Sequence, residues 1–195
     1  MSKSDPAASK KERNKTIRWV VTIFLATILI SGTISFVSDE IMERSSMFVA
    51  FIILFAIVLV GIIFDVIGVA VTSADEKPFH SMAARKVPGG AEAIRLLRNA
   101  ERVSSICNDV VGDICGVVSG SASATIAAQL LRNFELSAEN MIPLIMSALV
   151  AGLTVGGKAI GKTFAVHSCT SIVHTVGKLV WAFRRWPKSF GKRKK

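Results

Sequence analysis

The sequence predicts an all-α integral membrane protein with four transmembrane helices, a juxtamembrane helix pair and an amphipathic C-terminal helix. Hydrophobic residues make up 51% of the 195 residues, and they gather in long runs, of which residues 47–73 form the most apolar. That run exceeds the roughly 20 residues needed to cross a hydrocarbon core. The formal net charge of +10 lies largely in both tails and the central loop, where orientation signals of membrane proteins occur. We therefore expect one membrane domain and no nucleic-acid partner.

The N-terminal part is expected to contain a tail and one helix. Residues 1–16 are polar and carry five basic side chains, which predicts a disordered basic cytoplasmic tail. Residues 17–37 form an apolar run and predict the first transmembrane helix. A signal peptide is the alternative, but the run is long for one and lacks a clear A-x-A cleavage site. The acidic residues 38–46 predict a short outer turn.

Residues 47–73 predict the second transmembrane helix, and Asp65 is its single carboxylate. Gly61, Asp65, Gly68 and Thr72 are spaced by four, three and four residues, so they share one helix face. A carboxylate facing lipid costs several kcal/mol. This face is therefore expected to meet other helices or water.

Residues 74–102 are basic and amphipathic, and Pro88-Gly89-Gly90 divides them into two short helices. We expect both helices to lie along the inner membrane surface. An ordinary cytoplasmic helical hairpin is the alternative.

Residues 103–131 predict the third transmembrane helix, which is polar or small over nearly half of its circumference. The side chains concerned are Asn108, Asp109, Gly112, Asp113, Gly116, Ser119, Gly120 and Ser123. Close helix packing accounts for the glycines and serines, but it does not account for two aspartates. Residues 132–140, with Glu135 and Glu139, predict a second outer turn.

The C-terminal part begins with the fourth transmembrane helix, residues 141–157, whose inner end is marked by Lys158 and Lys162. Residues 163–183 predict an amphipathic helix, whose two histidines are expected to be interfacial rather than metal ligands. Residues 184–195 form a basic tail that is expected to bind anionic inner-leaflet lipids.

Four crossings place both termini on the cytoplasmic side, in the plasma (inner) membrane. Glycine and alanine at four-residue spacing let two helices approach closely, and we expect such faces to form a homodimer. They are Gly112, Gly116 and Gly120 on one helix, with Ala148, Gly152 and Gly156 on another.

Hydrolase, nucleotide-loop and zinc patterns are absent from the sequence, so no enzymatic activity is expected. The three cysteines are an odd number without ligand spacing and predict free thiols. Helical rise places Asp65 about 12 Å, and Asp109 and Asp113 about 9 and 15 Å, from the inner boundary. Oxygen-bearing side chains at one depth suit a hard cation that arrives from the cytoplasm.

From residue 47 to residue 185 the chain resembles the transmembrane domain of the cyclin M and CorB/CorC magnesium transporters. The resemblance rests on FDVIGVAVTSAD around Ser73, on ICNDVVGD around Asn108 and on GKAIGKT at residues 157–163. The family's cytoplasmic regulatory modules are not found in this sequence, and residues 17–37 are an additional helix. Where the family usually has a serine this chain has Asp65, and where it has a glutamate the chain has Lys158.

The resemblance implies a homodimer that binds partly dehydrated Mg²⁺ through hydroxyl, amide and backbone oxygens. Together with the carboxylates, the expected metal ligands are Asp65, Ser73, Asn108, Asp109 and Asp113. The alternative is a non-transporting membrane scaffold or regulatory relative in which Lys158 neutralises the buried carboxylates. Because Lys158 is near a helix end, we expect it to turn toward the headgroups and leave the carboxylates to a cation.

Overall fold

The structure is a computed structural model that describes residues 6–134 and 141–190, and every regular element in these ranges is helical. Four helical stretches are long and apolar enough to cross a membrane. They are Ile17–Arg44, Met47–Ser73, Ala100–Arg132 and Met141–His167. The predicted all-helical class with four apolar spans is therefore confirmed, and it indicates an integral membrane protein.

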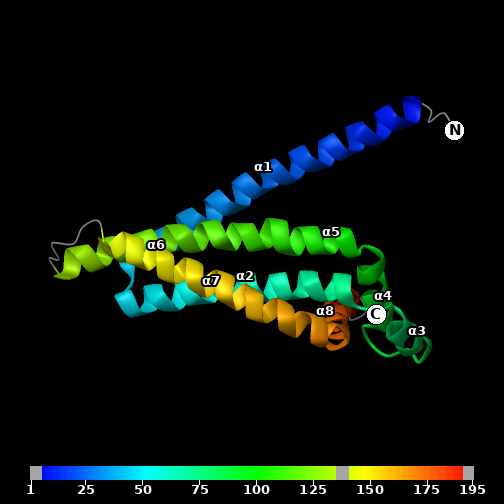
Figure 1. Cartoon of the computed structure of the whole chain (residues 1–195). Coiled ribbons are helices and arrows are strands. Elements are labelled where there is room, and N and C mark those ends of the chain that lie inside the picture. The colour runs from blue at the N-terminus through cyan, green and yellow to red at the C-terminus, as the bar shows by residue number, and fades with distance from the viewer. Residues whose placement is uncertain (1–5, 135–140, 191–195) are drawn as a thin grey trace.

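Helix α2 (Met47–Ser73) is the central helix of the bundle, because it packs against both α6 (Asp113–Phe134) and α7 (Met141–His167) (Figure 1). Glycines make this packing close. A Cβ atom on Gly61 would lie 2.9 Å from the Cβ of Cys115, and one on Gly161 would lie 2.7 Å from Cγ2 of Val66. Small residues allow such close approach between membrane helices, so these glycines fix how α2 meets its neighbours.

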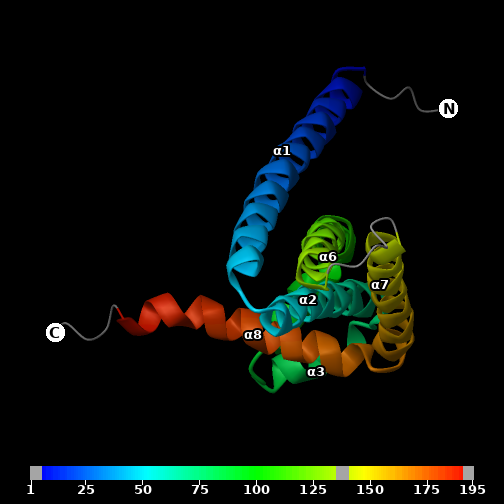
Figure 2. The same ribbon diagram turned by 90° about the vertical axis from the view of Figure 1, so that its left-hand side faces the viewer.

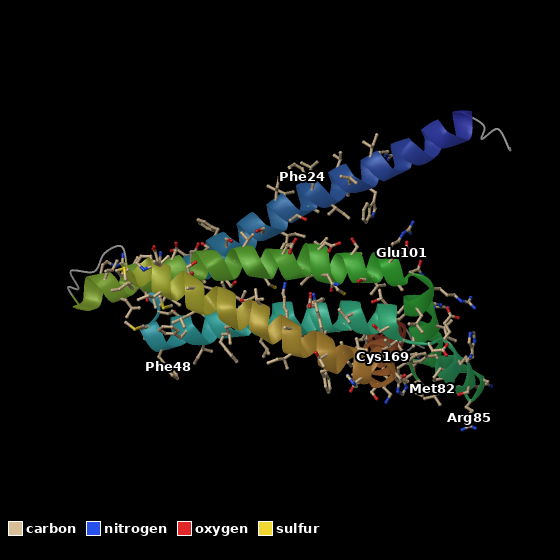
Figure 3. The ribbon with its side chains drawn as sticks, in the orientation of Figure 1. Phe24, Phe48, Met82, Arg85, Glu101 and Cys169 are labelled. Atoms are coloured by element: carbon tan, nitrogen blue, oxygen red, sulfur yellow. The ribbon has the colours of Figure 1, made fainter. Side chains whose placement is uncertain are left out.

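Two hydrophobic cores lie toward opposite ends of α2. The first joins the C-terminal end of α1 (Pro6–Arg44) to α2, α6 and α7. Its buried members are Met42, Ala50, Leu54, Val58, Ala122, Ile126 and Val150. The second joins α2 and α7 to the short helices α3 (Lys77–Ala84) and α4 (Gly90–Arg98) and to the longer α8 (Cys169–Phe190). Its buried members are Ala70, Val71, Phe79, Ala93, Leu97, Ala165 and Val173. Figure 3 shows Phe48 near the first end and Met82 and Arg85 near the second.

Helix α1 (Pro6–Arg44) is longer than predicted at both ends. Part of the predicted disordered tail, from Pro6 onward, is helical, while residues 1–5 lie outside the described part. Proline is well tolerated in the first turn of a helix. The predicted outer turn at 38–46 is also mostly helix, and only Ser45 and Ser46 separate α1 from α2. Nothing in residues 38–44 breaks a helix, and Arg44 pairs with Glu40 one turn earlier.

The third span is not a regular α-helix. Helix α5 (Ala100–Ser105) leads into a seven-residue π-helix, η1 (Ile106–Gly112), which continues as α6. A π-helix is rare, and inside an α-helix it is frequently found at functional sites. Hydropathy alone does not reveal such a segment, and the sequence did not predict it. The predicted second outer turn falls largely on residues 135–140, which lie outside the described part.

Between α2 and α5 lie two short helices, α3 (Lys77–Ala84) and α4 (Gly90–Arg98). The break between them falls at the predicted Pro88-Gly89-Gly90. Gly89 there has a φ of +88°, a backbone conformation that glycine adopts without steric cost.

Helix α8 (Cys169–Phe190) begins later than predicted, because α7 continues past Gly157 to His167. In Figure 1 α8 is seen nearly end-on, whereas in Figure 2 it extends across the view beneath α2 and α6. It therefore runs transverse to the bundle. A Cβ on Gly177 of α8 would meet the carbonyl oxygen of Gly89 at 2.6 Å, so backbones of α4 and α8 touch there.

Candidate functional site between α2 and the π-helix

The candidate site is the contact of α2 with η1, where Gly68 faces Asn108. A Cβ on Gly68 would collide with the Asn108 amide oxygen. The Asn108 amide nitrogen donates a hydrogen bond to Ser104 Oγ at 3.3 Å. Its oxygen Oδ1 is buried and has no hydrogen-bond partner among the described residues. Such an unsatisfied buried acceptor costs free energy unless a donor or cation reaches it.

Asp65 lies on the same face of α2 as Gly68 and is only 4% exposed. Its oxygen Oδ2 is the second buried oxygen without a hydrogen bond among the described residues. Asp65 and Gly68 are three residues apart, which corresponds to an axial offset of about 5 Å. Asp65 therefore lies on the face of α2 that contacts Asn108, about one helical turn from that contact.

Lys162 of α7 is the charged partner of Asp65. Its Nζ lies 3.8 Å from Asp65 Oδ2, and its side chain is 54% exposed. This distance permits Coulombic attraction but exceeds that of a hydrogen bond. The counter-ion is thus loosely held and keeps a route to the surface.

Lys158 does not take the predicted position. Its side chain is half-buried, and a Cβ on Gly112 would lie 3.5 Å from its Nζ. Lys158 therefore points toward η1 rather than to the headgroups, and no ion pair joins it to a carboxylate among the described residues. The alternative in which Lys158 neutralises the carboxylates is not what the structure shows for Asp65, because the lysine near that carboxylate is Lys162.

Three of the five predicted ligands lie apart from this contact. Ser73 at the end of α2 is exposed, and so are Asp109 and Asp113. Among the residues that the structure describes, no group of three or more His, Cys, Asp or Glu side chains is arranged to hold a metal ion. Within one chain Asp65 and Asn108 are thus associated with one face of α2, whereas Ser73, Asp109 and Asp113 are exposed.

Asp109 and Asp113 share their exposed helix face with Gly116 and Gly120. A Cβ on either glycine would meet nothing within 4 Å, and the same holds for Gly152 on α7. Exposed carboxylates in a spanning segment are costly if they face lipid. This face therefore requires protein or water against it.

Sequence reasoning missed a polar contact between α1 and α6. The Asp39 carboxylate accepts hydrogen bonds from Ser121 Oγ at 2.7 Å and Thr125 Oγ1 at 3.2 Å. Gln129 Nε2 also donates to the Met42 carbonyl at 2.7 Å. Because Asp39 was assigned to an outer turn, its bonds to a helix were not anticipated. The hydroxyl pair at i and i+4 on α6 was the available signal.

In comparisons with protein-family models, with curated proteins and with solved structures, this chain matches none.

Proposed function

We propose that this chain transports divalent cations, preferring Mg²⁺, and that Asp65 and Asn108 provide protein oxygens of its intramembrane site. The observation that carries this proposal is that one buried oxygen on α2 and one on η1 have no hydrogen-bond partner among the described residues. Oxygen ligands suit hard cations, and Mg²⁺ usually keeps several waters while binding one or two carboxylates. One carboxylate and one amide therefore suffice. The resemblance to the cyclin M and CorB/CorC transporters supports the same ion.

Lys162 is the competitor of the cation in this proposal. Its ammonium neutralises Asp65 when no ion is bound, and it has to move away when a cation arrives, because like charges repel. Its exposed, flexible side chain permits that movement. Asp65 thus alternates between two cationic partners.

The second candidate function is a membrane scaffold without transport. It is favoured by the same ion pair, because Lys162 at 3.8 Å already neutralises Asp65. A neutralised buried carboxylate needs no ion.

Transport is tested with purified protein in liposomes that contain a Mg²⁺-sensitive dye. We expect Mg²⁺ flux with the parent protein and at least a tenfold loss in Asp65→Asn, which keeps the shape but removes the charge that attracts the ion. Glu43→Gln is the matched control, because Glu43 is exposed at the other end of the bundle. Equal flux in liposomes with and without the parent protein would contradict transport and favour the scaffold function.

The orientation follows from the charges at the two ends. Exposed basic side chains surround α3 and α4; they are Lys77, Arg85, Lys86, Arg95, Arg98 and Arg102. The positive-inside rule places this end in the cytoplasm, together with both termini. In a background without the native cysteines, Ser45→Cys should react with an impermeant reagent from outside, and Ser81→Cys should not. The reverse pattern would invert the topology.

The chain is proposed to form a homodimer through the exposed faces of α6 and α7. A second copy would cover Asp109 and Asp113 and bring further oxygens toward the membrane interior. Because a Cβ on Gly116 or Gly152 would meet nothing within 4 Å in one chain, we expect Gly116→Leu and Gly152→Leu to fit the protomer and to obstruct only a partner.

We expect both leucine variants to elute as folded monomers in size-exclusion chromatography with light scattering. Gly61→Leu is the contrasting variant, because Gly61 packs against Cys115 inside the chain, and it should unfold the protomer instead. A dimer that persists in both Gly116→Leu and Gly152→Leu would place the interface on another face.

A further inference from the structure

An apolar groove opens between α2, α7 and the transverse helix α8. It has a volume of about 550 Å³, within the range of about 300–1,000 Å³ that is typical of ligand sites. Its walls include Ile63 and Ile67 of α2, Phe164 of α7, and Ile172, Val176 and Leu179 of α8. The groove is separate from the Asp65–Asn108 contact, since Gly61 and Gly68 turn the opposite face of α2 to α6 and η1.

One edge of the groove is polar. Ser171 and Thr175 of α8 lie along it, and Lys178, three residues after Thr175, continues the same helix edge. The Lys178 side chain is exposed. The apolar groove is thus lined by two hydroxyl-bearing residues of α8, and the next turn of that helix edge carries the exposed Lys178.

The position of α8 identifies the kind of molecule that fits. Helix α8 runs transverse to the bundle (Figure 2), and its groove side continues outward with Leu179 and Phe183, which are 59% and 78% exposed. An amphipathic helix of this type lies in the plane of the membrane interface. In that orientation we expect the groove to open toward acyl chains and Lys178 to face the lipid headgroups.

We propose that this groove binds an acyl chain of a phospholipid with an anionic headgroup, and that Lys178 selects the headgroup. The chain fills the apolar space between α2, α7 and α8. The headgroup phosphate lies near Ser171, Thr175 and Lys178, because an ammonium attracts an anionic lipid more strongly than a zwitterionic one. The lipid would thereby join α8 to the spanning helices.

The test is native mass spectrometry of the full chain released from nanodiscs with equal parts of dioleoyl phosphatidylglycerol and dioleoyl phosphatidylcholine. We expect the parent protein to retain one lipid, with phosphatidylglycerol favoured about fivefold, the preference expected of one lysine near the surface. Ser171→Trp fills the groove and should abolish retention. Leu29→Trp is its control, because Leu29 is 70% exposed on α1, outside both the groove and the proposed dimer faces.

The headgroup is tested separately, in a variant that leaves the groove open. Lys178→Gln should retain lipid without the preference for phosphatidylglycerol, whereas Arg184→Gln, which removes an equal charge from exposed Arg184 on the same helix, should keep it. No retained lipid in the parent, or undiminished retention in Ser171→Trp, would overturn the proposal. A change from dimer to monomer in Ser171→Trp, with lipid retained, would instead assign the groove to a second copy.

Discussion

Gly89→Ala is expected to destabilise the protein strongly. Gly89 has a φ of +88°, and a Cβ there would lie 2.6 Å from the backbone nitrogen of Lys178. Backbone strain and overpacking together cost about 2–5 kcal/mol. Because the obstructing atom belongs to the backbone, a side-chain rotation cannot relieve it, and α4 has to separate from α8.

The measurement is thermal unfolding of the purified protein in one detergent. Gly177→Ala should behave like Gly89→Ala, since its Cβ would meet the Gly89 carbonyl oxygen from the other side. Gly116→Ala is the matched control, because open space surrounds Gly116, and its effect should stay within about 0.5 kcal/mol. Equal stability of the Gly89 and Gly116 variants would contradict the close contact of α4 with α8.

Lys162→Met is expected to lower the stability of the metal-free protein by about 2–3 kcal/mol, somewhat less than the 3–5 kcal/mol of fully buried pairs because Lys162 is half-exposed. Removing the ammonium leaves the Asp65 carboxylate buried without its counter-ion. The double variant Asp65→Asn, Lys162→Met removes both charges and should recover most of the loss. Unfolding in chelator-treated detergent solution measures each value.

Lys158→Met is the control for this set. Lys158 occupies the preceding turn of the same helix, but it points to Gly112 and not to Asp65. Its replacement should therefore cost less than that of Lys162. If the two methionine variants lose equal stability, and the double variant recovers nothing, Lys162 is not the counter-ion of Asp65.

The four apolar spans could be predicted from the sequence because membrane helices are defined by the length and polarity of a run. Helix ends were less predictable. Hydropathy falls after Gly157, yet α7 continues to His167, because Gly157 and Gly161 pack closely against Ile62 and Val66 of α2. Tertiary packing, which a single run of residues does not show, extends this helix.

The candidate site was only partly predictable. The polar face of α2 predicted that Asp65 faces other helices, and the structure shows it buried. The contact of Gly68 with Asn108 agrees with a close approach of two helices. The π-helix around Asn108 was not predictable, because it depends on backbone hydrogen bonding rather than on composition. The sequence also could not show whether Lys158 or Lys162 lies near Asp65. Both lysines lie on one helix face, and only the register of α7 against α2 distinguishes them.

The position of Asp109 and Asp113 shows the same limit. Their depth in the third span follows from helical rise, but their direction depends on how that helix is rotated against α2. The structure turns Asn108 toward α2 and leaves both aspartates exposed. The prediction grouped Asp109 and Asp113 with Asn108 because they lie at similar depth, but within one chain these side chains point in different directions.

The most direct test of the cation site is the effect of Mg²⁺ on thermal stability of the parent protein, Asp65→Asn, Asn108→Leu and Lys162→Met. A ligand that binds only the folded state at 100 times its dissociation constant stabilises by about 2.7 kcal/mol. We predict that millimolar Mg²⁺ raises the melting temperature of the parent, raises that of Lys162→Met further, and leaves Asp65→Asn and Asn108→Leu unchanged. Absence of any Mg²⁺ effect in both the parent and Lys162→Met would contradict a cation site at Asp65 and Asn108.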